Sequence, residues 1–242
     1  MKIPTLAGII KRRILVNFRA DPDTVQRLLP AGFRPKLHRG KAVAGICLIR
    51  LEHIRPKMAP EFLGLNSENA AHRIAVEWDE DGETREGVFI PRRDTDSALN
   101  SIAGGTLFPG EQNRANFTVI ETDNGIDLVM ESQDHKVRVD LNATFAEELP
   151  KESIFMNLDD SSEFFRGGGL GYSVTRGAKH LDGMTLEIND WKVRPLEVES
   201  VTSSFYGDTD VFPEGTIEFD HALIMQNVEH EWHAAPDYSL SL

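Results

Sequence analysis

The segment from Ser67 to Asn116 reads SENAAHRIAVEWDEDGETREGVFIPRRDTDSALNSIAGGTLFPGEQNRAN, and it determines most of what the sequence says about the fold. The run from Asn69 to Trp78 reads as a strand. A charged turn separates this run from a second one, Gly87 to Pro91, so the two predict a hairpin. A short helix is expected from Asp94 to Ala103, because Gly104-Gly105 follows it as a common helix stop.

Outside this segment the chain reads as many short strands joined by turns. Ile14 to Arg19 predicts a strand, and Asp21-Pro22 then supplies the N-cap and the first position of a helix. The Arg39-Gly40 pair predicts the turn of another hairpin. Further strands are expected at 117–121, 126–131, 136–144, 171–175, 184–188, 193–201 and 217–226, with a short helix at 157–165. Few helices and many turn-bounded strands favour a closed or nearly closed antiparallel sheet.

In its order of elements, this segment resembles the middle of the acetoacetate decarboxylase-like superfamily. The opening RRILVNFRADPDTVQRLLPAGFRP, the hairpin HRGKAVAGICLIRL and the later VTSSFYGD and FDHALIMQNVEHEW look like an uncharacterised bacterial branch of it. The resemblance extends from Ile14 to Trp232. It implies a β-rich (α+β) chain built on a closed antiparallel β-barrel with a few short peripheral helices. We expect residues 1–242 to form a single domain of this kind, because no low-complexity stretch or linker divides the chain.

The resemblance also draws attention to a lysine. In the superfamily, a glycine-rich turn ending in aromatic-proline carries the lysine that forms a Schiff base with the substrate. Here the matching turn is Phe108-Pro109-Gly110-Glu111, and the sequence has no lysine between Lys57 and Lys136. Schiff-base formation requires an amine, so the sequence predicts no acetoacetate decarboxylation by that route.

Two residues on the first strand of the segment are candidates for proton transfer. Glu68 falls where the superfamily's strand glutamate falls, and strand alternation places His72 on the same face. If that face lines the pocket, the two could act as acid and base. A shift of one residue in the register would instead turn Asn69, Arg73 and Glu77 inward.

Several arginines follow on the next strand and turn. Arginine binds a carboxylate with two parallel hydrogen bonds, so Arg92 or Arg93 is a candidate for holding an acid substrate. Successive strand residues face opposite ways, so we expect one of the two to enter the pocket. Glu111 and Arg114 are further candidates for the pocket mouth, because they follow the turn where the superfamily's lysine resides. Asp94 reads most simply as a helix cap.

The composition excludes several classes of function. The chain carries 39 acidic and 26 basic residues, a net charge of −13, and no basic patch of the kind that binds nucleic acid. No segment approaches the ~18 consecutive apolar residues that span a membrane, and no signal peptide is evident, so a cytoplasmic location is expected. The single cysteine, Cys47, lies in an apolar strand and is expected to be a buried, inert thiol.

No metal or cofactor is expected. His230 and His233 would point to opposite faces of an extended segment, whereas zinc needs three or four converging ligands. The glycines from Gly167 to Gly171 do not have the spacing of a dinucleotide-binding motif.

Two functions remain open on the sequence. One is an enzyme, lyase-like, that uses acid–base chemistry on a small organic or oxo acid. The other is a non-catalytic protein that binds such a ligand in the same pocket. A structural subunit of a homo-oligomer is a third, weaker hypothesis. An enzyme needs two ionisable groups that converge on one ligand position, whereas a binding protein needs only an apolar pocket with a polar anchor.

Overall fold

The fold is strand-rich, as the sequence predicts. A computed structural model describes residues 4–98, 110–175 and 180–240. The helical elements are α1 (Pro22–Gln26), α3 (Leu158–Arg166) and the 3₁₀ turn η1 (Glu61–Leu63). The strands are β1 (Leu6–Ala20), β2 (Arg34–Pro35), β3 (Leu37–His38), β4 (Lys41–Pro56), β5 (Leu65–Glu80), β6 (Glu83–Thr95), β7 (Gln112–Glu121), β8 (Gly125–Ser132), β9 (Arg138–Phe145), β10 (Leu170–Val174), β11 (His180–Ile188), β12 (Arg194–Ser203), β13 (Ile217–Ala234) and β14 (Tyr238–Ser239).

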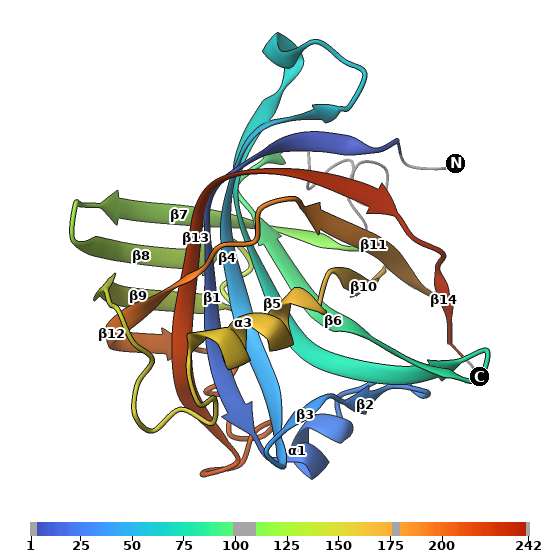
Figure 1. Ribbon diagram of the computed structural model, residues 1–242, viewed down its shortest axis with the longest axis vertical. Helices are drawn as coiled ribbons and strands as arrows, with labels where there is room; N and C mark the ends of the chain where they lie inside the picture. Colours follow the sequence, from blue (N-terminus) through green and yellow to red (C-terminus); the bar gives the residue numbers. More distant parts are fainter. Residues whose placement is uncertain (1–3, 99–109, 176–179, 241–242) are drawn as a thin grey trace.

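The sheet closes on itself. Along the chain of pairings β6-β7-β8-β9-β12-β13-β1-β4-β5, the last strand pairs again with β6 and completes a ring (Figure 1). A second ring runs β6-β10-β11-β13 and returns through β1, β4 and β5. The two rings therefore share five strands. The pairings are antiparallel apart from β6 with β7 and β6 with β10 in the part of the chain that is described.

The shared strands bury both of their faces, which explains why β4 is an almost continuous apolar run. Ala44, Ile46 and Leu48 point into the core of the first ring. Val43 and Cys47 point the other way, into a second core beneath α3 and β11. Strand alternation thus separates two interiors rather than an interior from solvent.

Local sequence signals are confirmed at the first helix and the hairpin turn. The Asp21 carboxylate accepts a hydrogen bond from the Thr24 amide at 2.8 Å and caps α1. Arg39 and Gly40 both adopt positive φ, at 48° and 77°, as a two-residue turn between β3 and β4 requires.

The expectation at Asp94 is wrong. β6 continues through Thr95, so Asp94 is a strand residue rather than a helix cap. Its side chain is fully buried and forms an ion pair with Arg92 at 2.8 Å. This ion pair stabilises the extended backbone beyond Pro91, where the strand was predicted to end. Residues 99–103 of the predicted helix and the Phe108-Pro109 pair lie outside the described residues.

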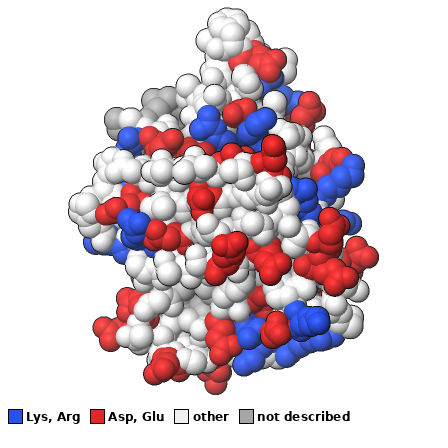
Figure 2. All heavy atoms as spheres, turned by 90° about the vertical axis from the view of Figure 1, so that its left-hand side faces the viewer, with Lys and Arg blue, Asp and Glu red and all other residues white. Residues whose placement is uncertain are grey.

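Acidic and basic side chains are interspersed on the face that carries β7, β8 and β9, with acidic groups spread across it (Figure 2). None of the described helices is both long enough and apolar enough to cross a membrane.

Candidate functional site

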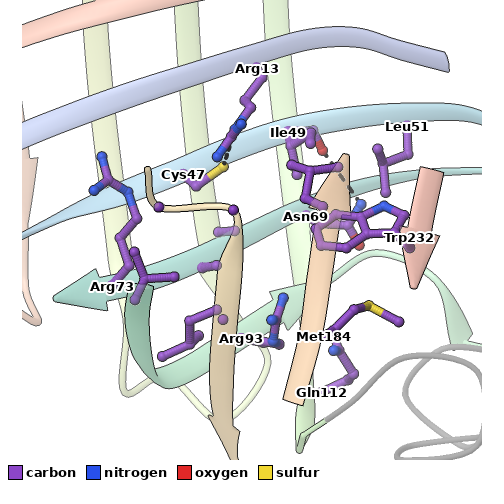
Figure 3. Close-up of a pocket in the computed structure, with 18 residues that line it drawn as sticks. Arg13, Cys47, Ile49, Leu51, Asn69, Arg73, Arg93, Gln112, Met184 and Trp232 are labelled. Carbon is purple, nitrogen blue, oxygen red and sulfur yellow. Dashed lines mark hydrogen bonds between the residues drawn. The ribbon is translucent and has the colours of Figure 1, made fainter. Parts of the chain in front are cut away.

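A cavity of about 80 Å³ lies between the shared strands and a cover made by β10, β11 and the glycines that precede β10 (Figure 3). We name it the arginine cavity after Arg13, Arg73 and Arg93, which come from β1, β5 and β6. Its other lining residues are Cys47, Ile49, Leu51, Asn69, Ala70, Ala71, Val88, Ile90, Gln112, Gly168, Gly169, Gly171, Met184, Leu186 and Trp232.

None of the three arginines forms an ion pair with a carboxylate within residues 4–98, 110–175 and 180–240. Arg93 Nε donates to Ser173 Oγ at 2.9 Å. Arg13 Nε donates to Cys47 Sγ at 3.3 Å, and its guanidinium lies 5.7 Å from the Trp191 ring. Neither contact neutralises a positive charge, and both side chains are only partly exposed to solvent.

Arg73 is the most deeply buried of the three, with 4% of its surface exposed. It donates to Asn17 Oδ1 and lies 4.8 Å from the centre of the Phe165 ring, while its Nε has no partner among the described residues. Burial lowers the pKa of Arg73 and the pKa of Arg93 to about 10 each. The site is therefore an apolar cavity whose three guanidinium groups have no carboxylate at ion-pair distance in the described chain, with Asp182 acting on Arg93 only from further away.

The register of β5 decides which residues enter this cavity. Asn69 and Arg73 line it, together with the intervening Ala71. Glu68 and His72 project from the opposite face of the strand. The alternative register that turns Asn69 and Arg73 inward is thus the one adopted at the cavity.

Glu68 does not share a cavity with Arg93, which corrects the expected geometry. Its carboxylate forms ion pairs with Arg12 at 2.6 Å and Arg50 at 3.6 Å, beside an open depression that also contains Glu121. Burial raises the pKa of Glu68, and the two guanidinium groups act in the opposite direction. The ion pairs with Arg12 and Arg50 account for the buried carboxylate of Glu68 without a ligand.

His72 is a residue of the first core. It is fully buried, and both ring nitrogens lack a hydrogen-bond partner in the described structure. Its ring packs 4.6 Å from that of Phe205 and 5.7 Å from that of Tyr206, measured between centroids. Burial lowers the pKa of His72 to about 3, so the imidazole is neutral at pH 7. The catalytic role predicted for Glu68 and His72 stays a prediction, and their positions do not bring them together at the cavity.

Arg93 enters the cavity and Arg92 does not, as expected for successive strand residues. Arg92 is paired with Asp94 at 2.8 Å and with Asp134 at 3.1 Å. Arg114 donates to the backbone carbonyl of Asp96 and is absent from the cavity wall.

Gly110 and Glu111, which the resemblance matched to the superfamily's lysine-bearing turn, are held by hydrogen bonds that their backbone amides donate. Gly110 has a positive φ of 82°, and its amide donates to Asp182 Oδ2 at 2.9 Å. The Glu111 amide donates to the Val174 carbonyl at 2.9 Å. The next residue, Gln112, reaches the cavity wall, whereas the predicted Glu111 does not.

Sequence reasoning missed Arg13 and the cavity role of Cys47. Cys47 is buried as expected, with 8% exposed, but it lies in the cavity wall next to a guanidinium. The sequence contains little indication of the role of Arg13. It stands next to Arg12, which is equally basic but faces the other ring, so the sequence alone does not distinguish the two.

A buried hydrogen-bond network that begins at Asn17 holds the Arg73 side chain in place. Asn17 accepts from Arg73 and lies 3.2 Å from His221 Nε2. His221 in turn contacts Ser161 Oγ at 2.7 Å and Asp220 Oδ1 at 2.6 Å. A serine, histidine and aspartate in this order can form a nucleophilic site, but Ser161 has no exposed surface. The network fastens α3 to β13 and fixes the arginine.

One cluster of the described residues could hold a metal ion. His180 Nε2 lies 3.4 Å from Asp182 Oδ1 and 3.9 Å from Asp237 Oδ2. The group is partly exposed at the end of β11. His230 and His233, set aside as ligands on sequence grounds, do not belong to it.

Comparison with known proteins places the chain in a family. Residues 10–219 match the model of the DUF2071 family, which is described as an uncharacterized conserved protein. The chain belongs to the DUF2071 family. No curated protein matches it.

The solved structures show which fold the DUF2071 chain adopts. An acetoacetate decarboxylase from Legionella pneumophila is 13% identical with a TM-score of 0.61, over 98% of this chain and 89% of that one. An acetoacetate decarboxylase-like enzyme from Sphingomonas wittichii RW1 is 14% identical with a TM-score of 0.59, over 100% and 94%. The enduracididine biosynthesis enzyme MppR is 13% identical with a TM-score of 0.58, over 100% and 90%. The resemblance to acetoacetate decarboxylase-like proteins is confirmed at the level of the fold.

Proposed function

We propose that this DUF2071 protein binds a small organic acid in the arginine cavity, with the ligand's carboxylate on Arg93. The observation that carries the proposal is a set of three guanidinium groups around one apolar cavity without a carboxylate partner in the described chain. A guanidinium matches a carboxylate with two parallel charge-assisted hydrogen bonds. Such a ligand supplies the negative charge that Arg93 lacks.

The remaining wall suits the carbon skeleton of the ligand. Ile49, Leu51, Met184, Leu186 and Trp232 contribute apolar surface, and the amide of Asn69 is held within the protein by Ser67 and Thr95. Another structure of the similarly folded MppR is described as complexed with pyruvate, with a TM-score of 0.55 and 13% identity to this chain. An oxo acid is therefore a reasonable first probe.

The make-up of the wall favours binding over acid–base catalysis. Among its described residues the ionisable groups are the three arginines and Cys47, so no carboxylate, imidazole or amine faces the ligand there. A lyase-like reaction of the kind predicted for Glu68 and His72 needs such groups within hydrogen-bonding reach of the substrate.

The test is calorimetric titration and thermal unfolding with acetate, butyrate and pyruvate, beside the neutral butyramide. At a ligand concentration 100 times the Kd, binding adds about 2.7 kcal/mol to the free energy of unfolding. For a chain of this size that corresponds to a rise in Tm of roughly 5–10 °C. The acids should produce this rise and the amide should not.

The matched variants are Arg93→Gln and Arg50→Gln. Arg50 lies on β4 between two cavity-lining residues but faces the other ring, where its ion pairs are long, at 3.5 and 3.6 Å. The first variant should abolish the response and the second should preserve it. Equal binding of butyramide and butyrate, or full binding by Arg93→Gln, would refute the proposed function.

A further inference from the structure

The number of unpaired arginines bears on the charge of the ligand. Elsewhere in the molecule a buried arginine is matched by two carboxylates, as Arg12 is by Glu68 and Glu121, and Arg92 by Asp94 and Asp134. The arginine cavity has three guanidinium groups and no carboxylate among its described lining residues. One carboxylate would leave two positive charges in an apolar wall, which is unfavourable.

The strand register separates two of these arginines. Arg93 pairs with Ala71 of β5, and Arg13 pairs with Ile49 of β4. Their strands, β6 and β1, are three strand spacings apart, which is about 14 Å across the sheet. In Figure 3 the Arg13 side chain descends beside Cys47, while the Arg93 side chain lies toward Gln112 and Met184. The two groups therefore approach the cavity from different sides and do not form one compact cluster.

The volume limits the ligand to a small molecule. A cavity of about 80 Å³, measured with a water-sized probe, has room for several waters, which suits an acid with a short carbon chain. A four-carbon dicarboxylic acid falls in this size class.

We propose that the ligand is a four-carbon dicarboxylic acid, with one carboxylate on Arg93 and the other on Arg13 across the cavity. This inference rests on the proposed function and specifies its ligand. Arg73 lines the cavity with its guanidinium held by Asn17 and Phe165, and its positive charge favours the dianion without a direct contact being required. Cys47 and Ala71 lie between the two anchoring arginines, where they contact the central carbons.

The experiment is a calorimetric titration with oxalate, malonate, succinate, glutarate and adipate, beside acetate, butyrate and inorganic phosphate. Succinate should bind most tightly, and at least about tenfold more tightly than butyrate, because a second charge-assisted contact is formed. Affinity should decrease for both shorter and longer diacids. This chain-length series uses the wild-type protein alone, so it remains decisive even if a variant fails to fold.

Two variants test the assignment of the ends. Arg13→Gln should lower succinate affinity to about that of butyrate while leaving butyrate within about twofold of wild type. Arg93→Gln should abolish binding of both, and Arg50→Gln should change neither.

Three results would overturn the inference. Equal affinity for butyrate and succinate would show a single carboxylate site, and the proposed function would survive. Tighter binding of phosphate than of succinate would indicate one compact anion. An unchanged succinate-to-butyrate ratio in Arg13→Gln would remove Arg13 from the site. Failure of every acid to bind would instead refute the proposed function itself.

Discussion

Replacement of Arg93 by methionine should stabilise the ligand-free protein while abolishing acid binding. The guanidinium is held among apolar residues with a serine hydroxyl as its described hydrogen-bond partner. A residue retained at a cost to stability is typical of a binding site, because the ligand supplies the missing charge only when it is bound. Methionine has a similar length and fills the space without a charge.

The magnitude follows from the shift in pKa. Burial lowers the pKa of Arg93 to about 10, well below its ordinary value, and at about 1.4 kcal/mol per pH unit the charged form costs the folded state at most about 3.5 kcal/mol. Part of the side chain faces the cavity, where water screens the charge, and we take about half of that cost. Loss of the hydrogen bond to Ser173 offsets about 1 kcal/mol. The net gain is about 1 kcal/mol, or roughly 2–4 °C in Tm.

The pH dependence has a definite sign. Below pH 9 Arg93 is protonated in both folded and unfolded states, so the advantage of the variant should be constant. Above about pH 10 the folded wild type loses this proton while the unfolded chain, with the ordinary higher pKa of arginine, retains it. The unfolded state then binds more protons, so the stability of the wild type rises with pH relative to the variant.

The assay is urea unfolding followed by far-ultraviolet circular dichroism at pH 7, with and without ligand. At a saturating concentration of acid the wild type should become more stable than Arg93→Met, because only the wild type gains binding free energy. The neighbouring Arg92→Met is the control and should destabilise the protein, since it leaves Asp94 buried beside no other described cation. A loss of more than about 1 kcal/mol in ligand-free Arg93→Met would mean that the protein itself compensates the charge, which would refute the reasoning.

Further predictions concern the surroundings of the cavity. Arg12→Gln should cost about 3–5 kcal/mol in urea unfolding, because Glu68 stays buried with only a distant partner; a loss below about 1 kcal/mol would contradict this. The pKa of His72 is lowered to about 3, so the unfolded state takes up its proton first, and the wild type should lose about 2 kcal/mol between pH 7 and pH 5. His72→Leu should remove that part of the acid sensitivity. Ala71→Phe should fill the cavity and abolish acid binding with little loss of stability, whereas Ala44→Phe in the core of the first ring should overpack that core and cost about 1–3 kcal/mol. Borohydride with acetoacetate should leave no lysine adduct detectable by mass spectrometry, and a stoichiometric adduct would disprove this.

Much of the fold could be predicted from local chemistry. Asp21 and Pro22 begin a helix because a carboxylate caps free amides and proline suits the first turn. The Arg39-Gly40 turn fixes the register of its hairpin because left-handed φ angles are tolerated there. The end of β6 was misjudged, because the buried pair of Arg92 with Asp94 and the contact with β7 are long-range features of the sheet.

The sequence by itself determined that the chain is strand-rich, that Cys47 is buried, and that no lysine stands between Lys57 and Lys136. It also predicted that only one of the successive strand residues Arg92 and Arg93 would enter the pocket. Only the tertiary structure decided which face of β5 meets the cavity. Strand alternation assigns the residues of β5 to two opposite faces. It does not tell which face meets the cavity, because each face is buried in one of two adjoining rings. The sequence also could not predict that Arg13 and Arg93 line the same cavity, because strands far apart in the chain come together only when the sheet closes.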